Sequence, residues 1–156
     1  MGNIFTDDFR DFIKALNANN VDYLLVGGYA VILHGYRRTT GNLDIWINPT
    51  ITNLQKLRAA FLQFGLPTTD LTEKNFLENN SIDVFSYGRA PVSIDVMKEV
   101  KGVNFEEAFE ASEIFIEKGL QIRYNNYPSL LTAKKSSGRH KDLDDIEKLS
   151  GQSLTD

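Results

Sequence analysis

The chain has 156 residues, ten Phe and six Tyr, enough for one domain over residues 1–156 with a substantial core at about residues 6–149. It has a net charge of −4, no Cys and only two His, which argues against a generally basic nucleic-acid binder and excludes disulfides, thiolate metal sites and a His-rich metal site. No run reaches the ~20 apolar residues of a membrane span and no signal peptide is evident, so we expect a cytoplasmic protein with no membrane partner.

The first predicted element is a helix that begins after Thr6 and ends in the Asn-rich segment 17–20. The Thr6 hydroxyl can cap the helix, and Asp7 and Asp8 suit the positive end of its dipole. Apolar residues then recur at helical spacing, which predicts a helix that covers the core and carries no chemistry.

A short buried strand and a glycine pair come next. Tyr23–Val26 is an apolar run typical of a buried strand, and Gly27 and Gly28 follow where the chain turns into a short helix at about Tyr29–His34. Bare backbone amides at the start of a helix form a site for phosphate oxygens. We interpret His34 as a helix-end residue, with a phosphate or base contact as the alternative.

A basic loop leads into a second strand that carries a carboxylate. Arg37 and Arg38 lie in the loop, and Asn42 and Asp44 fall on the same face of the strand because alternate residues point the same way. A phosphate cradle beside a strand-borne carboxylate is what metal-assisted phosphoryl chemistry requires. The two arginines are either solvated charges or, for Arg38, a phosphate ligand.

The middle of the chain predicts a helix, a polar connection and a hairpin. The helix begins at Thr50 and ends at Gly65, and a short helix at about 72–77 follows. Two strands, 81–86 and 92–97, are joined by a turn at 87–91.

Both strands of this hairpin contain Ser-Ile-Asp-Val, so Asp83 or Asp95 could complete a metal site. Asp95 is the better candidate, because Val92, Ile94 and Val96 form a clean apolar face that leaves its carboxylate on the opposite side. Asp83 is interpreted as an exposed hairpin residue.

The last third predicts a short helix, a second hairpin and two helices. Glu106 and Glu107 fit the first turn of the short helix better than a metal site. The elements are a helix at 105–111, strands at 113–117 and 120–124, a helix with Pro128 at its start and Gly138 at its end, and a last helix with Leu143, Ile146 and Leu149. A basic cluster lies at the end of the first of these two helices and just after it: Lys134, Lys135, Arg139, His140 and Lys141. It either faces the active site and neutralises a triphosphate or an RNA acceptor, or it is the solvated basic end of a helix. Asp142 is expected to pair with one of these basic residues and not to bind a metal.

Two ordered motifs are similar to a known family. Residues 26–31 read Val-Gly-Gly-Tyr-Ala-Val, and residues 38–46 fit Arg-x-Thr-x-Asp-Leu-Asp-Ile-Trp except that Asn42 stands at the first aspartate. This resembles the nucleotidyltransferases related to DNA polymerase beta, and more narrowly the small bacterial stand-alone members. Ile94-Asp95, the segment from Gly102 to Ala108 and the ending Lys-x-x-x-Gly-Arg-x-Lys-Asp-Leu-x-Asp agree with the same family.

The resemblance implies an α+β, nucleotidyltransferase-like fold, in which a small mixed β-sheet has helices packed against it. It also implies transfer of a nucleoside monophosphate from a triphosphate, with Mg²⁺ or Mn²⁺, to a hydroxyl of a protein or RNA. Relatives often occur in toxin–antitoxin pairs, so a cognate protein partner is expected. The implied metal and catalytic residues are Asn42, Asp44 and Asp95, and the implied nucleotide ligands are Gly27, Gly28, Arg38, Thr40, Lys134, Arg139 and Lys141.

Asn42 leaves activity open, because an amide offers a metal one carbonyl oxygen but no negative charge. Three hypotheses therefore remain. The chain is an active nucleotidyltransferase, a nucleotide-binding pseudoenzyme, or a nucleic-acid-binding module that uses Arg37, Arg38 and the basic cluster.

Overall fold

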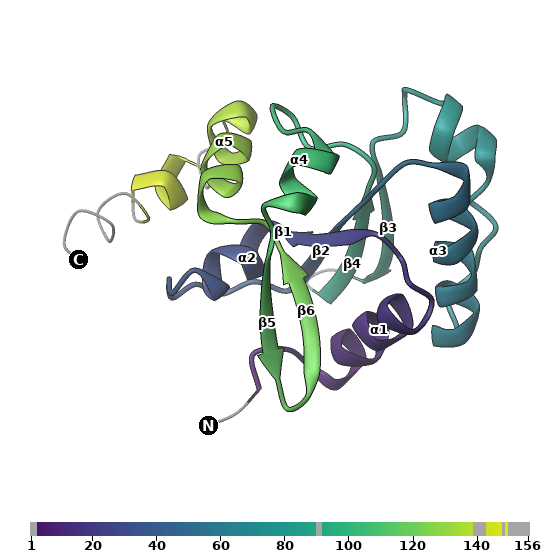
Figure 1. The fold of residues 1–156 in the computed structure, drawn as a ribbon, viewed down its shortest axis with the longest axis horizontal. Coiled ribbons are helices and arrows are strands. Elements are labelled where there is room, and N and C mark those ends of the chain that lie inside the picture. Colours follow the sequence, from purple (N-terminus) through teal and green to yellow (C-terminus); the bar gives the residue numbers. More distant parts are fainter. Residues whose placement is uncertain (1–2, 90–91, 139–142, 148, 150–156) are drawn as a thin grey trace.

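The architecture is a six-stranded mixed sheet with helices on both faces, seen in a computed structural model that describes residues 3–89, 92–138, 143–147 and 149 (Figure 1). The strand order is β3-β4-β2-β1-β6-β5, with β1 antiparallel to β2 and parallel to β6, and β2 parallel to β4. The strands are β1 (Tyr23–Val26), β2 (Asn42–Ile47), β3 (Val84–Arg89), β4 (Val92–Met97), β5 (Glu113–Glu117) and β6 (Leu120–Tyr124). The helices are α1 (Asp7–Ala18), α2 (Gly27–Leu33), α3 (Ile51–Phe64), the π-helix η1 (Lys74–Glu78), α4 (Phe105–Glu110) and α5 (Tyr127–Ser137), and residues 143–147 are also helical.

The larger core lies between one face of the sheet and helices α1 and α3. Leu43, Ile45 and Ile47 alternate along β2 toward this side, and Phe12 of α1 packs edge-on against Phe61 of α3. All five side chains are fully buried, so the helical spacing of α1 and the period of two in β2 meet in one apolar layer.

The opposite face of the sheet carries a smaller core and the polar residues of interest. Leu24, Val26 and Trp46 point to this side and pack with Phe105 of α4. In Figure 1, α4 and α5 lie on the other side of the strands from α1. The even-numbered residues of β2 therefore face α4 and α5, not the larger core.

Most predicted elements are confirmed, including β1, β4, both strands of the β5–β6 hairpin, and helix starts capped by Thr6 and Thr50. Three boundaries were wrong. The strand predicted at 81–86 is β3 at Val84–Arg89, because Tyr87, Gly88 and Arg89 continue the pairing with β4 instead of turning. The helix predicted at 72–77 is the π-helix at Lys74–Glu78. The glycine pair is the first two residues of α2, which begins before Tyr29.

None of the helices in the described part of the chain combines the length and the hydropathy of a membrane span.

Candidate active site

Asp44 and Asp95 are direct neighbours across two parallel strands. The register pairs Asp44 of β2 with Asp95 of β4, and Asn42 with Ser93. Neighbouring strands lie about 5 Å apart, and residues paired in register project to the same face. The sheet therefore places the two predicted carboxylates and the predicted Asn42 side by side, although Asp95 lies fifty-one positions after Asp44 in the chain.

Asn42 is held by a residue that the sequence analysis did not single out. Its carboxamide oxygen accepts a hydrogen bond from the Ser93 hydroxyl at 3.0 Å. That oxygen keeps a second lone pair for another ligand. In the described part of the chain, no three His, Asp or Glu side chains form a group able to hold a metal, and Asp44 and Asp95 stand here as a pair.

Gly27 and Gly28 are required by close approach as well as by backbone conformation. Gly27 has φ +70, and a Cβ at this position would lie 2.1 Å from Asp44 Oδ2. A Cβ on Gly28 would lie 2.8 Å from the Thr40 hydroxyl oxygen. Both glycines thus bring the start of α2 against the predicted site residues Asp44 and Thr40, where larger residues would hold them apart.

The start of α2 has no side-chain cap. Val26 occupies the N-cap position in an extended conformation, and its side chain cannot accept a hydrogen bond from the first amides of the helix. The start of α2 follows Val26, which pairs with Asp44 across β1 and β2. Backbone donors next to a carboxylate pair suit a ligand that is anionic and also carries a cation.

Two of the predicted phosphate ligands converge on a carboxylate that the sequence analysis left without a role. Arg38 Nη1 lies 2.7 Å and Lys134 Nζ 3.1 Å from Asp145 Oδ2. The Asp145 and Lys134 side chains are almost fully buried and that of Arg38 is mostly buried. Asp145 ends the Gly-Arg-x-Lys-Asp-Leu-x-Asp motif, so the signal for it was present in the sequence.

The ion pairs of Arg38 and Lys134 with Asp145 weaken the nucleic-acid hypothesis. Arg38 and Lys134 bind a protein carboxylate instead of extending into solvent as a basic surface patch would. Arg139, His140 and Lys141 lie outside the described residues, as does Asp142, which was expected to pair with one of the basic residues.

A small cavity of about 130 Å³ adjoins Asp44, between the sheet and α5. Gly27, Asp44 and Lys134 line it together with Asn125, which follows β6. The side chains that face it from the strands and from α5 are mostly apolar. The cavity therefore joins the predicted phosphate cradle to an apolar recess.

His34 has a structural contact, in agreement with the interpretation as a helix-end residue. It follows the last residue of α2, and its Nε2 lies 2.9 Å from the main-chain oxygen of Asn125. Its ring meets Tyr124 and Tyr127 edge-on. His34 thus ties α2 to the chain between β6 and α5.

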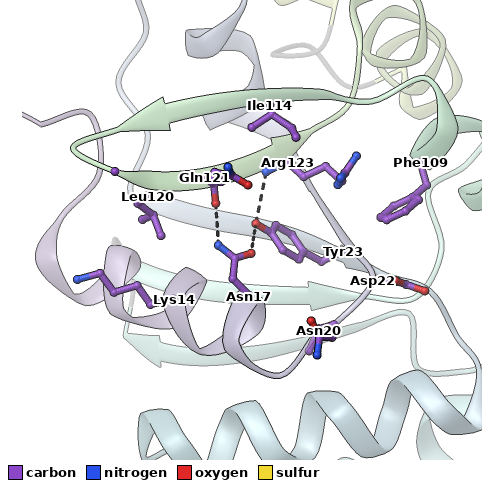
Figure 2. A pocket seen from close by; sticks show the side chains of 12 residues that line it. Lys14, Asn17, Asn20, Asp22, Tyr23, Phe109, Ile114, Leu120, Gln121 and Arg123 are labelled. Carbon is purple, nitrogen blue, oxygen red and sulfur yellow. Dashed lines mark hydrogen bonds between the residues drawn. The ribbon is translucent and has the colours of Figure 1, made fainter.

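A larger groove of about 550 Å³ lies at the other end of β1, between α1 and the β5–β6 hairpin (Figure 2). Its polar groups bond to one another: Tyr23 donates to Asn17 Oδ1 at 2.9 Å and accepts from the Arg123 amide at 3.3 Å. Burial raises the pKa of Tyr23 to about 12. Because β1 separates this groove from Gly27 by about 13 Å, it is distinct from the candidate site.

The other acidic residues that were weighed lie away from the carboxylate pair. Asp83 is exposed and precedes β3, as interpreted from the sequence. Glu106 and Glu107 are exposed in the first turn of α4, where the Asn104 side chain caps the helix.

No protein-family model and no curated protein sequence matches this chain, but solved structures do. ANT(2")-Ia in complex with adenylyl-2"-tobramycin superposes with a TM-score of 0.58 at 14% identity, covering 94% of this chain and 87% of its own. The chain has a nucleotidyltransferase-like fold. The lincosamide antibiotic adenylyltransferase LnuA, bound to lincomycin, gives a TM-score of 0.54 at 16% identity, covering 96% and 98%. An antigenic nucleotidyltransferase-like protein from Paracoccidioides brasiliensis gives 0.56 at 16% identity, covering 90% and 72%.

This likeness confirms the expected α+β architecture, with a mixed sheet and packed helices. Identities of this size support the fold alone.

Proposed function

We propose that this protein is a nucleotidyltransferase that binds a nucleoside triphosphate and transfers its nucleoside monophosphate to a hydroxyl group, releasing pyrophosphate. The observation that carries the proposal is the pairing of Asp44 with Asp95 in register, directly beside the glycine that contacts Asp44. The fold shared with two proteins named as adenylyl-transfer enzymes or holding an adenylylated product is consistent with it.

The donor set fits a divalent cation carried with the triphosphate. Mg²⁺ is usually held by one or two carboxylates together with substrate phosphates and water, and Mn²⁺ accepts similar oxygen ligands. Asp44, Asp95 and the carbonyl oxygen of Asn42 would hold it here. When bound, the cation supplies positive charge that offsets the negative charge of the reacting phosphate.

Other residues of the chain would bind the phosphates. The amides at Gly27 and Gly28 donate to phosphate oxygens, and Arg38 and Lys134 add positive charge close to the cradle. Thr40 lies against Gly28 and can donate its hydroxyl to the same phosphates. Arg139 and Lys141 are proposed as further phosphate ligands from their place in the sequence motif.

Asp95 is proposed as the base. The acceptor oxygen attacks the α-phosphorus, the bond to the leaving pyrophosphate breaks, and the hydroxyl proton passes to the Asp95 carboxylate. Asp44 lies against Gly27 and pairs with Asp95, so it would lie between the phosphate cradle and the proposed base.

For the acceptor, we propose a protein or RNA hydroxyl, and a cognate antitoxin or toxin protein as the biological partner. The solved neighbours include proteins bound to an adenylylated antibiotic and to lincomycin. A small-molecule hydroxyl is therefore an outcome that the assay must be able to report.

A second candidate is a nucleotide-binding pseudoenzyme, and the Asn42–Ser93 contact favours it. The Ser93 hydroxyl donates to the Asn42 oxygen at 3.0 Å, which orients the amide but adds no charge. The site thus keeps its phosphate-binding parts while one of three family carboxylates is replaced. Loss of that charge weakens metal-dependent turnover more than nucleotide binding.

The test is transfer of label from each α-labelled triphosphate, with Mg²⁺ or Mn²⁺ and a cell extract. We expect Asp95→Ala to lower transfer by about 100-fold or more. Asp83→Ala, which changes the exposed aspartate of the other Ser-Ile-Asp-Val segment, is the matched control and should leave transfer unchanged.

Asn42→Asp separates the two candidates. Transfer by the natural chain, lost in Asp95→Ala, supports the enzyme. Transfer by Asn42→Asp alone supports the pseudoenzyme. Transfer that survives in Asp95→Ala would refute the assigned site.

A further inference from the structure

Asn125 has a buried side-chain oxygen without a hydrogen-bond partner in the described part of the chain. The residue is 2% exposed, and among the described residues its carboxamide oxygen has no hydrogen-bond partner. Leaving such an atom unpaired costs about 1–3 kcal/mol, so buried polar atoms are nearly always satisfied. A carboxamide kept in this state points to a donor that is supplied from outside the chain.

The main chain prevents Asn125 from relieving the cost by moving. Its amide donates to the Leu25 oxygen at 3.2 Å, and its carbonyl oxygen lies 2.9 Å from His34 Nε2. The residue is thus fixed between β1 and the end of α2, and only its side chain is left to meet a ligand. Leu25 and His34 flank the glycine pair of the proposed phosphate cradle.

The same side chain lines the cavity next to Asp44. The cavity measures about 130 Å³, room for the volume of about four waters, and so for a ring system but not a whole nucleotide. Five apolar side chains form most of the remaining lining: Val26, Met97, Val100, Leu130 and Ala133. The polar lining residues besides Asn125 are Asp44, Glu99, Lys101, Lys134 and Ser137. A recess with apolar walls and a few polar groups, one of them a carboxamide whose oxygen has no partner among the described residues, is an arrangement that suits a planar heterocycle.

We propose that this cavity receives the nucleobase of the triphosphate and that Asn125 is a specificity-determining residue that reads the edge of the base. The inference rests on the proposed function, since Gly27 and Asp44 belong to both the cavity lining and the phosphate cradle. It adds to that function a selection among the four triphosphates.

The donor and acceptor of the carboxamide determine which bases can pair with it. Its oxygen accepts from an exocyclic amine, while its amide group donates to a neighbouring ring nitrogen, a bidentate pairing that adenine and cytosine offer. Uracil presents a carbonyl oxygen where cytosine carries its amine, and guanine does so where adenine does. In the orientation that the structure records, either oxygen would face the carboxamide oxygen and leave it unpaired, whereas a carboxamide turned by 180° would favour uracil and guanine instead.

The experiment is isothermal titration of the full chain with α,β-methylene analogues of ATP, CTP, GTP and UTP in the presence of Mg²⁺. We expect the adenine or the cytosine analogue to bind roughly tenfold or more tightly than the guanine and uracil analogues. Separate titrations of the adenine and cytosine analogues show which of these two bases the cavity takes.

Two variants test the residue itself. In Asn125→Ala and Asn125→Asp the preference is expected to fall to within about threefold, because either the whole carboxamide or its donor group is lost. Asn80→Ala, at an exposed asparagine away from the cavity, should keep the preference of the natural chain. Since no described residue bonds to the Asn125 oxygen, the thermal midpoint of Asn125→Ala should be equal to or higher than that of the natural chain.

The outcomes separate the two proposals. Binding of all four analogues with equal affinity, or a preference that persists in both Asn125 variants, overturns the base-reading role and leaves the proposed function standing. Binding of none of them refutes the proposed function, and the base site with it.

Discussion

The contact between Gly27 and Asp44 allows the sharpest test of the site. Gly27→Ala would place a Cβ 2.1 Å from Asp44 Oδ2, 2.9 Å from its Cγ and 3.1 Å from its Cβ. Turning the Asp44 side chain can move the oxygen and the Cγ but not the Cβ. Because carbon atoms in proteins ordinarily approach to 3.5–4.0 Å, α2 and β2 must also separate slightly.

The cost has two parts, and a second glycine isolates one of them. An L-residue at φ +70 costs about 1–2 kcal/mol. Gly119→Ala, at φ +81 with nothing within 4 Å of the added Cβ, carries this part alone. Moving Asp44 off its rotamer and opening the contact adds roughly 1–2 kcal/mol in Gly27→Ala.

The assay is urea unfolding of both variants, paired with triphosphate titration. We expect the free energy of unfolding to fall by about 1–2 kcal/mol in Gly119→Ala and by about 2–4 kcal/mol in Gly27→Ala. Only Gly27→Ala should weaken triphosphate binding, by tenfold or more. Equal losses of stability together with equal affinities in the two variants would refute the claim that the cradle depends on this close approach.

Three further predictions concern stability. Burial raises the pKa of Tyr23 to about 12, so the folded state favours the neutral phenol. The free energy of unfolding should therefore be unaffected by this group below pH 10 and should fall by about 2–3 kcal/mol as the pH rises to 12. Urea unfolding of Tyr23→Phe should show a smaller loss over this range. Asp145→Ala leaves two mostly buried cations without their shared carboxylate and should cost about 3 kcal/mol in urea unfolding, an effect of under 1 kcal/mol being contrary to the buried cluster. Glu117→Ala removes the 2.6 Å partner of buried Arg10 and should lower the thermal midpoint by several degrees, whereas an unchanged midpoint would mean that this pair contributes nothing.

Local pattern predicted the site residues that lie close together in the chain. The glycine pair ends a buried strand, and alternation in β2 puts Asn42 and Asp44 on one face. Both inferences need only the period of a strand and the absence of a glycine side chain, so they do not depend on the rest of the fold.

The predicted bounds of β3 were wrong because pairing with β4 determines where this strand ends. Tyr87, Gly88 and Arg89 look like a turn, yet β4 pairs with them and extends β3. Gly88, at φ +99, lies within the strand. Turn-forming residues express a local preference, and the hydrogen bonds of a neighbouring strand override it.

The contacts that define the site could not be predicted from the sequence, because they too depend on strand pairing. Ser93 stands two residues before Asp95, but only the register of β2 with β4 shows that it bonds to Asn42. Asn125 follows a predicted strand without any motif, and its unpaired oxygen becomes visible only with its surroundings. Such facts depend on which strands are neighbours, and composition and spacing do not contain that information.

By itself, the sequence determined that the chain carries a strand, a glycine pair and a strand-borne carboxylate, because these follow from side-chain size and strand periodicity. The tertiary structure decided that Asp95 completes the pair and that Arg38 and Lys134 meet at Asp145. It also decided that a cavity opens beside Asp44. Each of these joins residues far apart in the chain, and only the packing of the sheet against α4 and α5 brings them within contact distance.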